Sequence, residues 1–434
     1  MIDKIINYLK SKVDEYEVFY NKNNSLNAEI ASDKISFVSE GVTHGVAIRV
    51  VVDGKFGFAY TSNLENFKDC VDTALKVAKV SKKDENFKGF VKPKTFKVVK
   101  DLNKDVVELT PEYIHEFNNQ FVSNVKEVNK NILYSIGMFN KNVSESRIIN
   151  SEGVDLDNKT AVNSMEGGLV IENKGRLEML EFEMGDKNLL DVNVAKSHAQ
   201  RLLGLLNKKQ MDTCNIPLIL HPEALASLFS QSYVFSVSGE NLFLKKSKFK
   251  IGEKVFDDKI TITDDALTKG LFCTRPFDKE GTKSQKFNVI ENGVFKNALY
   301  DNYYGKLVGK KSTGNAQRSV VSLPSILPNN IVIKAGNVKD VLNDVDKAIY
   351  VRGMLGVHTM NEATGDFSVG VMEGHYVEKG KLKYAVKDTM IAGNFFDLMN
   401  NVVSVGKKIE HSLDVSGGCY MPEILFKNVK VIGN

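Results

Sequence analysis

The side chains that could bind a metal ion or act as a general base are scattered through this 434-residue chain. No two of its seven histidines stand at the spacing with which a regular helix chelates zinc. The pair His115-Glu116 begins like a metalloprotease helix, but asparagine and glutamine occupy positions 119 and 120. We interpret this pair as part of a solvated helix face. These residues by themselves therefore predict no reaction.

Other patterns that mark common enzyme classes are also missing from the sequence. It has no GxSxG nucleophile elbow, no Walker phosphate loop and no Rossmann glycine fingerprint. The glycines of Gly365-Asp-Phe-Ser-Val-Gly370 lie in a strand-rich context, so we predict a hairpin there rather than a phosphate-binding loop. His221 and Glu223 could be a remnant catalytic site, but helix capping and first-turn electrostatics explain Glu223 better.

Composition and charge exclude several functional classes. Hydrophobic residues make up 42% of the chain and charged residues 26%, which is typical of globular proteins. The net charge of +4 is too small to indicate a nucleic-acid binder. No apolar run reaches the roughly 18 residues that span a membrane, and the first residues do not form a signal peptide. Four widely spaced cysteines without a CxxC pair are typical of reduced thiols. We therefore expect a cytoplasmic protein that binds neither nucleic acid nor membrane.

Hydrophobic periodicity predicts an α+β fold that begins with two α/β modules of strands flanked by helices. The first module is a domain over 1–85, with a hairpin turn at Asp53-Gly54. Its expected helices cover 2–12 and 63–82, and its expected strands cover 17–20, 28–31, 34–38, 45–52 and 57–60. A connector over 82–105 leads into the second domain, 86–210. Its expected helices cover 110–128 and 189–206, and its expected strands cover 132–139, 147–150, 168–172 and 177–183.

The third expected domain, 211–434, is large, rich in β structure and mostly antiparallel, because glycine turns separate many short strands. It opens with a strand over 216–220. An apolar helix should then begin at Pro222, which suits a first helical position, and continue toward 237. Further helices are expected near 338–348 and 396–401.

The order of several short motifs in the third domain resembles the TldD/PmbA family, also called modulators of DNA gyrase. The motifs are Phe277-Asp-Lys-Glu-Gly-Thr282, Val289-Ile-Glu-Asn-Gly-Val294, Lys311-Ser-Thr-Gly-Asn-Ala316, Thr364-Gly-Asp-Phe-Ser368, Ile391-Ala-Gly-Asn394 and Gly418-Cys419. Residues 45–59 look like the family's first domain. The resemblance covers essentially the whole chain, and it is the joint order of the motifs that is specific.

The resemblance implies where a metal site would lie. The TldD branch is a zinc metallopeptidase with an HExxxH helix and a later cysteine ligand, whereas the TldE or PmbA branch lacks these histidines. Here the matching positions are Phe229, Ser230 and Val234, and Cys419 matches the region of the cysteine. A spacing of five residues is a rotation of about 140° on a regular helix, so two such ligands require a local distortion. One thiol cannot hold zinc alone, and a small buried residue is the simpler interpretation of Cys419.

The resemblance also implies a function. We expect a TldE/PmbA-like subunit of a zinc metalloprotease complex that acts on unfolded or extended peptides. This chain would have no catalytic residue and no metal, its TldD-like partner would hold the zinc, and the chain could form a heterodimer with that partner or a homodimer. A metal-free regulatory protein that binds peptides, or that is linked to a toxin–antitoxin pair or to gyrase, is the alternative; an independent peptidase with unrecognised ligands is a third. The turn at Gly314 and Asn315 could line a substrate channel or could simply form a tight loop.

Overall fold

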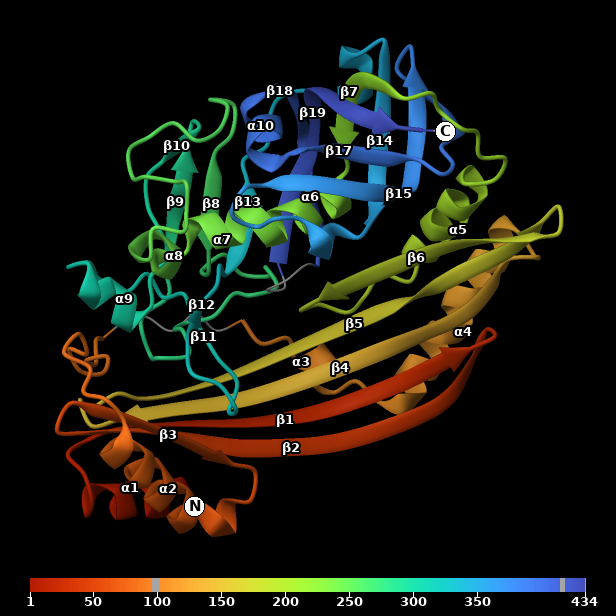
Figure 1. Cartoon of the computed structure of the whole chain (residues 1–434). Helices are drawn as coiled ribbons and strands as arrows, with labels where there is room; N and C mark the ends of the chain where they lie inside the picture. Colours follow the sequence, from red (N-terminus) through yellow and green to blue (C-terminus); the bar gives the residue numbers. More distant parts are fainter. Residues whose placement is uncertain (96–100, 414–417, 434) are drawn as a thin grey trace.

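The computed structural model describes residues 1–95, 101–413 and 418–433 and builds the first part of the chain around one long antiparallel sheet (Figure 1). The strand order is β3-β2-β1-β4-β5-β6. The two expected N-terminal modules share this sheet, because β1 pairs with β2 on one side and with β4 on the other. The division into domains 1–85, 86–210 and 211–434 stays a prediction. The strands are β1 (Glu15–Ala31), β2 (Lys34–Val52), β3 (Lys55–Thr61), β4 (Leu133–Asn150), β5 (Asp155–Asn173) and β6 (Arg176–Asp186).

Several strands predicted as separate short pieces are continuous. The pieces 17–20 and 28–31 are both part of β1, and the pieces 132–139 and 147–150 are both part of β4. The polar stretch between each pair of pieces lacks the alternation that indicates a strand, which is why the sequence suggested interruptions. Ladder hydrogen bonds from neighbours on both sides hold these polar residues extended. The hairpin at Asp53-Gly54 is confirmed, with positive φ values of 52° and 74°.

The helices of the N-terminal part cover one face of this sheet, and the C-terminal part covers the other (Figure 1). Strand alternation explains the division: even-numbered residues of β1, such as Val18 and Ala28, pack against helices, whereas Phe19 packs against Phe277 of the C-terminal part. As predicted, Thr110 caps the helix that follows it, with its hydroxyl accepting from the Tyr113 N–H. These helices are α1 (Ile2–Lys10), α2 (Phe67–Val80), α3 (Lys104–Val107), α4 (Pro111–Val128) and α5 (Val194–Gly204), with a 3₁₀ turn at Leu64–Asn66. Within the expected connector, residues 96–100 lie outside the described part.

The C-terminal part contains a second, mostly antiparallel sheet, which confirms the α+β class. Its main path runs β10-β9-β8-β13-β19-β17-β15-β14-β7, and the pairs β13–β19 and β14–β7 are parallel. The strands are β7 (Cys214–Leu220), β8 (Ile262–Asp265), β9 (Lys286–Glu291), β10 (Val294–Phe295), β13 (Asn330–Ile333), β14 (Lys347–Leu355), β15 (Asp366–Glu378), β16 (Lys381–Ala385), β17 (Met390–Asn394), β18 (Val402–Ser412) and β19 (Gly418–Ile432). A separate two-stranded ladder joins β11 (Ala316–Gln317) and β12 (Ser325–Ile326).

Two local predictions in this part are wrong. The expected helix 338–348 is a 3₁₀ turn at Val341–Asp344 followed by β14, because Ile349 and Val351 pair with β7 and enter the core. The expected hairpin at 365–370 is the start of one continuous strand, β15, and only Gly365 (φ +83°) lies in a turn. The helix near 396–401 is confirmed as α10 (Phe395–Asn400). The remaining helices are α6 (Pro222–Leu228), α7 (Val234–Val237), α8 (Gly239–Phe243) and α9 (Asn302–Leu307), with a 3₁₀ turn at Val357–Thr359.

The largest hydrophobic core lies between this second sheet and the helices α6, α7 and α10. In the part of the chain that the structure describes, no helix is long and apolar enough to cross a membrane.

Candidate functional site

The helix that begins at Pro222 contains a π-helical turn, Phe229–Tyr233, between α6 and α7. The turn is defined by the Val234 N–H, which reaches back five residues to the Phe229 carbonyl. Such turns are rare and occur often at functional sites. This is the distortion that ligands spaced five residues apart would require, and it lies at the positions that the family resemblance assigned to the metal motif. The backbone geometry at these positions is therefore compatible with the predicted placement of the motif.

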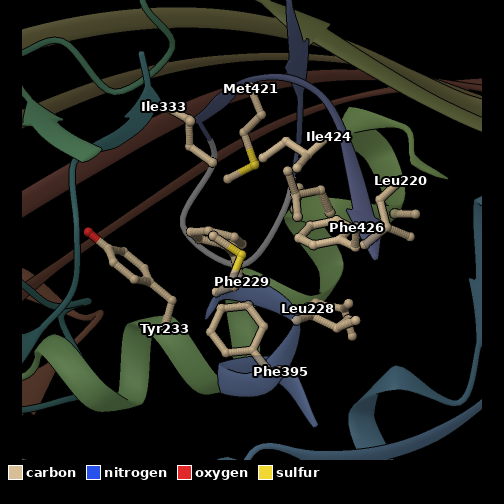
Figure 2. Packing of buried hydrophobic residues seen from close by; sticks show 14 of the residues in the cluster. Leu220, Leu228, Phe229, Tyr233, Ile333, Phe395, Met421, Ile424 and Phe426 are labelled. Carbon is tan, nitrogen blue, oxygen red and sulfur yellow. The ribbon is translucent and has the colours of Figure 1, made fainter. Parts of the chain in front are cut away.

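The side chains on this turn are occupied with packing and local hydrogen bonds. Phe229 is fully buried and makes an edge contact with Phe395, with ring centroids 5.2 Å apart. Figure 2 shows Phe229 within the core cluster, between Met421 and Phe395. The Ser230 hydroxyl donates to the Ser227 carbonyl at 2.7 Å, and Val234 packs against the same core. None of these groups is a usual zinc ligand.

Cys419 lies on β19 opposite Ile331 and Ser412, and it belongs to the same buried cluster as Phe229. That these residues mark the position of a former metal site stays a prediction. Burial raises the pKa of the buried Tyr233 phenol well above its ordinary value, and the charges of Asp264 and Cys419 act in the same direction. A zinc ion needs about four donor atoms, whereas these positions offer the Cys419 thiol and the Ser230 hydroxyl, which already donates to the Ser227 carbonyl, so this set does not fit zinc. No cluster of three or more His, Cys, Asp or Glu residues placed to hold a metal occurs among residues 1–95, 101–413 and 418–433.

His221 and Glu223 hold the start of α6 in place. The His221 ring caps the helix by accepting from the Glu223 N–H through Nδ1 at 3.2 Å, while its Nε2 lies 3.2 Å from Glu410. Glu223 accepts two hydrogen bonds from Arg352, at 2.7 and 3.1 Å, and one from Arg201 at 3.1 Å. Burial would raise the pKa of Glu223, but the two arginines outweigh it and lower that pKa from 4.5 to about 2. These contacts support the interpretation as a helix cap and an anchoring ion pair.

Acid titration should reveal this cluster. Because the folded-state pKa of Glu223 is depressed, its contribution to stability is present above pH 4.5 and is lost as the pH falls from 4.5 toward 2. The contribution of Glu410 to stability should also be lost as the pH falls, because its hydrogen bond to His221 lowers its pKa to about 2. We expect Glu223→Gln to make the free energy of unfolding less dependent on pH between 5 and 2, as measured by urea unfolding. The exposed Glu362→Gln serves as the control, and a variant curve as steep as that of the wild type would contradict the assignment.

Gly314 and Asn315, the predicted channel residues, lie in a buried turn. The Asn315 side-chain amide donates to Asp264 Oδ2 at 2.9 Å and to the Leu327 carbonyl at 3.0 Å, and its oxygen accepts from Thr313. Gly314 has φ +80°, and a Cβ there would lie 2.9 Å from the Lys283 carbonyl oxygen. These contacts show that Gly314 and Asn315 form a tight loop. A role of either residue in a substrate channel stays a prediction.

A buried ionic network, which the sequence did not predict, joins the N-terminal sheet to the C-terminal part. Arg49 of β2 donates through Nε to Glu17 of β1 at 2.7 Å and through a terminal nitrogen to Glu280 at 3.0 Å. Arg318 makes an ion pair with Glu17 at 2.7 Å, and its guanidinium stacks over Phe19 at 4.5 Å. The sequence did contain a signal for this network, because Glu17 and Arg49 are single charged residues within apolar strand runs. Charged residues are almost never buried unless they are paired.

Comparison with known proteins agrees with the fold. Residues 16–78 match the family profile described as PmbA/TldA metallopeptidase domain 1, and residues 213–433 match that of the PmbA/TldA metallopeptidase C-terminal domain. The chain belongs to the PmbA/TldD family of metallopeptidase-like proteins. The family predicted from the sequence is therefore confirmed.

Individual relatives cover nearly the whole chain. An uncharacterised protein of Methanocaldococcus jannaschii is 29% identical over 98% of both chains. A protein of the same organism named as a metalloprotease is 28% identical over 93% of this chain and 92% of its own. The crystal structure of TldE from Thermococcus kodakarensis is similar over 100% of both chains, with a TM-score of 0.91 and 26% identity.

Proposed function

We propose that this chain is a TldE/PmbA-type subunit that assembles with a TldD-type zinc metalloprotease, and that the assembly cleaves unfolded or extended peptides in the cytoplasm. The partner would hold the zinc. This chain would contribute part of the enclosing surface and contacts to the peptide. In the absence of the partner, the chain would form a homodimer through the same surface.

The observation that carries this proposal is the π-helical turn Phe229–Tyr233 without metal ligands. A chain that had never needed a metal site would have no reason to retain an uncommon backbone distortion at that place. A chain that itself cleaved peptides would need the ligands. The combination favours a subunit that shares the protease architecture and leaves the chemistry to another chain.

Two comparisons support the proposal. The likeness to the crystal structure of TldE from Thermococcus kodakarensis covers 100% of both chains. Methanocaldococcus jannaschii contains two relatives of similar identity to this chain, of which one is named as a metalloprotease and the other is not. Two members in one organism are what a two-subunit enzyme requires.

A groove beside an edge strand supports the binding of extended peptides. In the described structure β6 pairs only with β5, and its residues Leu177 and Met179 are exposed. They line a groove of about 1030 Å³ together with Leu355, Met372 and Met390 of the C-terminal part. An extended peptide can add to a free strand edge through its backbone, while flexible methionine side chains adapt to different sequences. This groove is where we place the peptide contacts.

The test uses the complete chain and a TldD-type partner that has an intact HExxxH, purified separately and mixed. We expect a heteromeric complex by size-exclusion chromatography, zinc in the partner only, and cleavage of an unfolded peptide only when both chains are present. Replacement of the partner's motif glutamate should abolish cleavage without dissolving the complex. Equal cleavage by the partner alone, or one equivalent of zinc in this chain alone, would contradict the proposal. Stable peptide binding without any association with the partner would favour the metal-free regulatory protein instead.

A further inference from the structure

A cavity of about 300 Å³ lies between the N-terminal sheet and the C-terminal part. One wall is formed by polar side chains of β4 and β5, such as Ser144 and Thr160, and the other by the segment from Phe272 to Lys279. Its volume is at the lower end of the range for small-molecule sites. The cavity shares no lining residue with the π-helical turn.

Arg275 brings a buried guanidinium to this cavity. It is only 9% exposed, and one terminal nitrogen donates to the side-chain oxygen of Asn329. Its Nε has no hydrogen-bond partner in the described residues. Burial lowers the pKa of Arg275, and the charges of Asp278 and Asp264 oppose that effect without an ion-pair contact in the described residues. A buried N–H without a partner is costly.

Lys279 places a second cation at the same cavity. Its ammonium lies 5.3 Å from the centre of the Phe19 ring, and among the described residues it makes no ion pair. Burial, together with the charges of Arg275 and Arg318, lowers the pKa of Lys279 to about 8. Arg275 and Lys279 line the same cavity, and an anion bound there would offset their mutual repulsion.

Asp278 is the acidic residue that lines the cavity, and its carboxylate oxygens are already bound by backbone N–H groups. The two oxygens of Asp278 accept backbone N–H groups of Glu280 and Thr282 at 2.9 Å and of Ala316 at 3.1 Å. Burial, together with the charge of Glu280, raises the pKa of Asp278 to about 7. Asp278 therefore holds its own turn in place.

We propose that this cavity binds the carboxylate of a small amphipathic ligand, with Arg275 and Lys279 as the cationic contacts. The rings of Phe19, Phe272 and Phe277 give the remaining wall apolar character, which suits a hydrophobic side chain beside the carboxylate. The chemistry is that of an N-acylated hydrophobic amino acid, whether it is free or the last residue of a peptide. The site needs no second chain and no metal, so it is independent of the function proposed above.

The experiment is calorimetric titration of the isolated complete chain with N-acetyl-L-leucine and with N-acetyl-L-leucinamide, which differs only in the missing charge. We expect saturable binding of the acid at one site per chain and at least about tenfold weaker binding of the amide, the difference that one charge-assisted hydrogen bond makes. A short peptide ending in leucine, with a free or an amidated C-terminus, distinguishes the sources of the carboxylate. Binding of both acids indicates peptide ends, and binding of the amino acid alone indicates a free metabolite; both support the site.

The variant Lys279→Gln should weaken binding of the acid about tenfold or more, and Lys279→Arg should restore it because the charge returns. The side chain of Lys279 has no hydrogen bond that the fold needs in the described residues, and the exposed Lys296→Gln is the matched control. Three results would overturn the proposal: equal binding of acid and amide, no saturable binding of either, or unchanged binding by Lys279→Gln.

Discussion

Replacing Glu17 with alanine is expected to lower the free energy of unfolding by about 3–5 kcal/mol, the usual cost of removing one partner of a buried ion pair. The Glu17 side chain has no exposed surface and contacts two cations, Arg49 and Arg318. After the substitution both guanidinium groups stay buried, with Glu280 as the one remaining carboxylate in contact with Arg49. Burial already lowers the pKa of Arg318 to about 10, which shows how unfavourable its charge is there.

Urea unfolding followed by circular dichroism measures this effect. The control is Glu145→Ala, because Glu145 also makes a lysine contact at 2.8 Å between strands but lies at the surface, where such a pair contributes at most about 1 kcal/mol. Glu17→Gln, which keeps the shape and loses the charge, should fall between the two. If Glu17→Ala were no more destabilising than Glu145→Ala, the network would not be what holds the two parts of the chain together.

The second large effect is expected at the π-helical turn. Phe229→Ala should destabilise the protein by about 3–5 kcal/mol, because it removes a fully buried ring from a close-packed core and leaves a cavity. The ring contacts Tyr233 and Phe395, with centroid distances of 5.1 and 5.2 Å. Phe243→Ala is the matched control, since Phe243 is 44% exposed. Similar unfolding curves for the two variants would show that Phe229 is not part of the core.

The variant Phe229→His extends this test to the metal site. An imidazole at this position would be buried in the hydrophobic core, and no group of three or more metal-binding side chains occurs in the described residues, so we expect destabilisation and no zinc-dependent rise in melting temperature. A rise in melting temperature with equimolar zinc would mean that further ligands approach this position. The donor set described above would then be incomplete.

Prediction from the sequence worked where local pattern carries the information. Pro222 suits a first helical turn wherever it occurs, and the helix begins there. Thr110 caps its helix because its hydroxyl accepts a hydrogen bond from a backbone N–H of the first turn. Asp53-Gly54 adopts the positive φ values that a tight hairpin needs. The expected helix at 338–348 is wrong because the chain makes only a 3₁₀ turn at Val341–Asp344 and then pairs with β15 from Lys347 onward.

The candidate site, too, could be predicted from the sequence only in part. That residues 229–234 lack histidine and glutamate is visible in the sequence, and so is the order of motifs that placed a metal helix there. The distortion of that helix, and the packing of Phe229 and Cys419 into one cluster, could be seen only in three dimensions.

By itself the sequence determined the family, the α+β class and the absence of metal-binding side chains at the expected positions, because each of these depends on residue identity and order along the chain. The tertiary structure decided that polar stretches pair into strands of up to 19 residues, that Arg49 meets Glu280 from 231 positions away, and that two cations share one cavity. Which strands pair, and which charged side chains are buried together, depends on residues that are far apart in the chain. A local sequence pattern does not identify those residues.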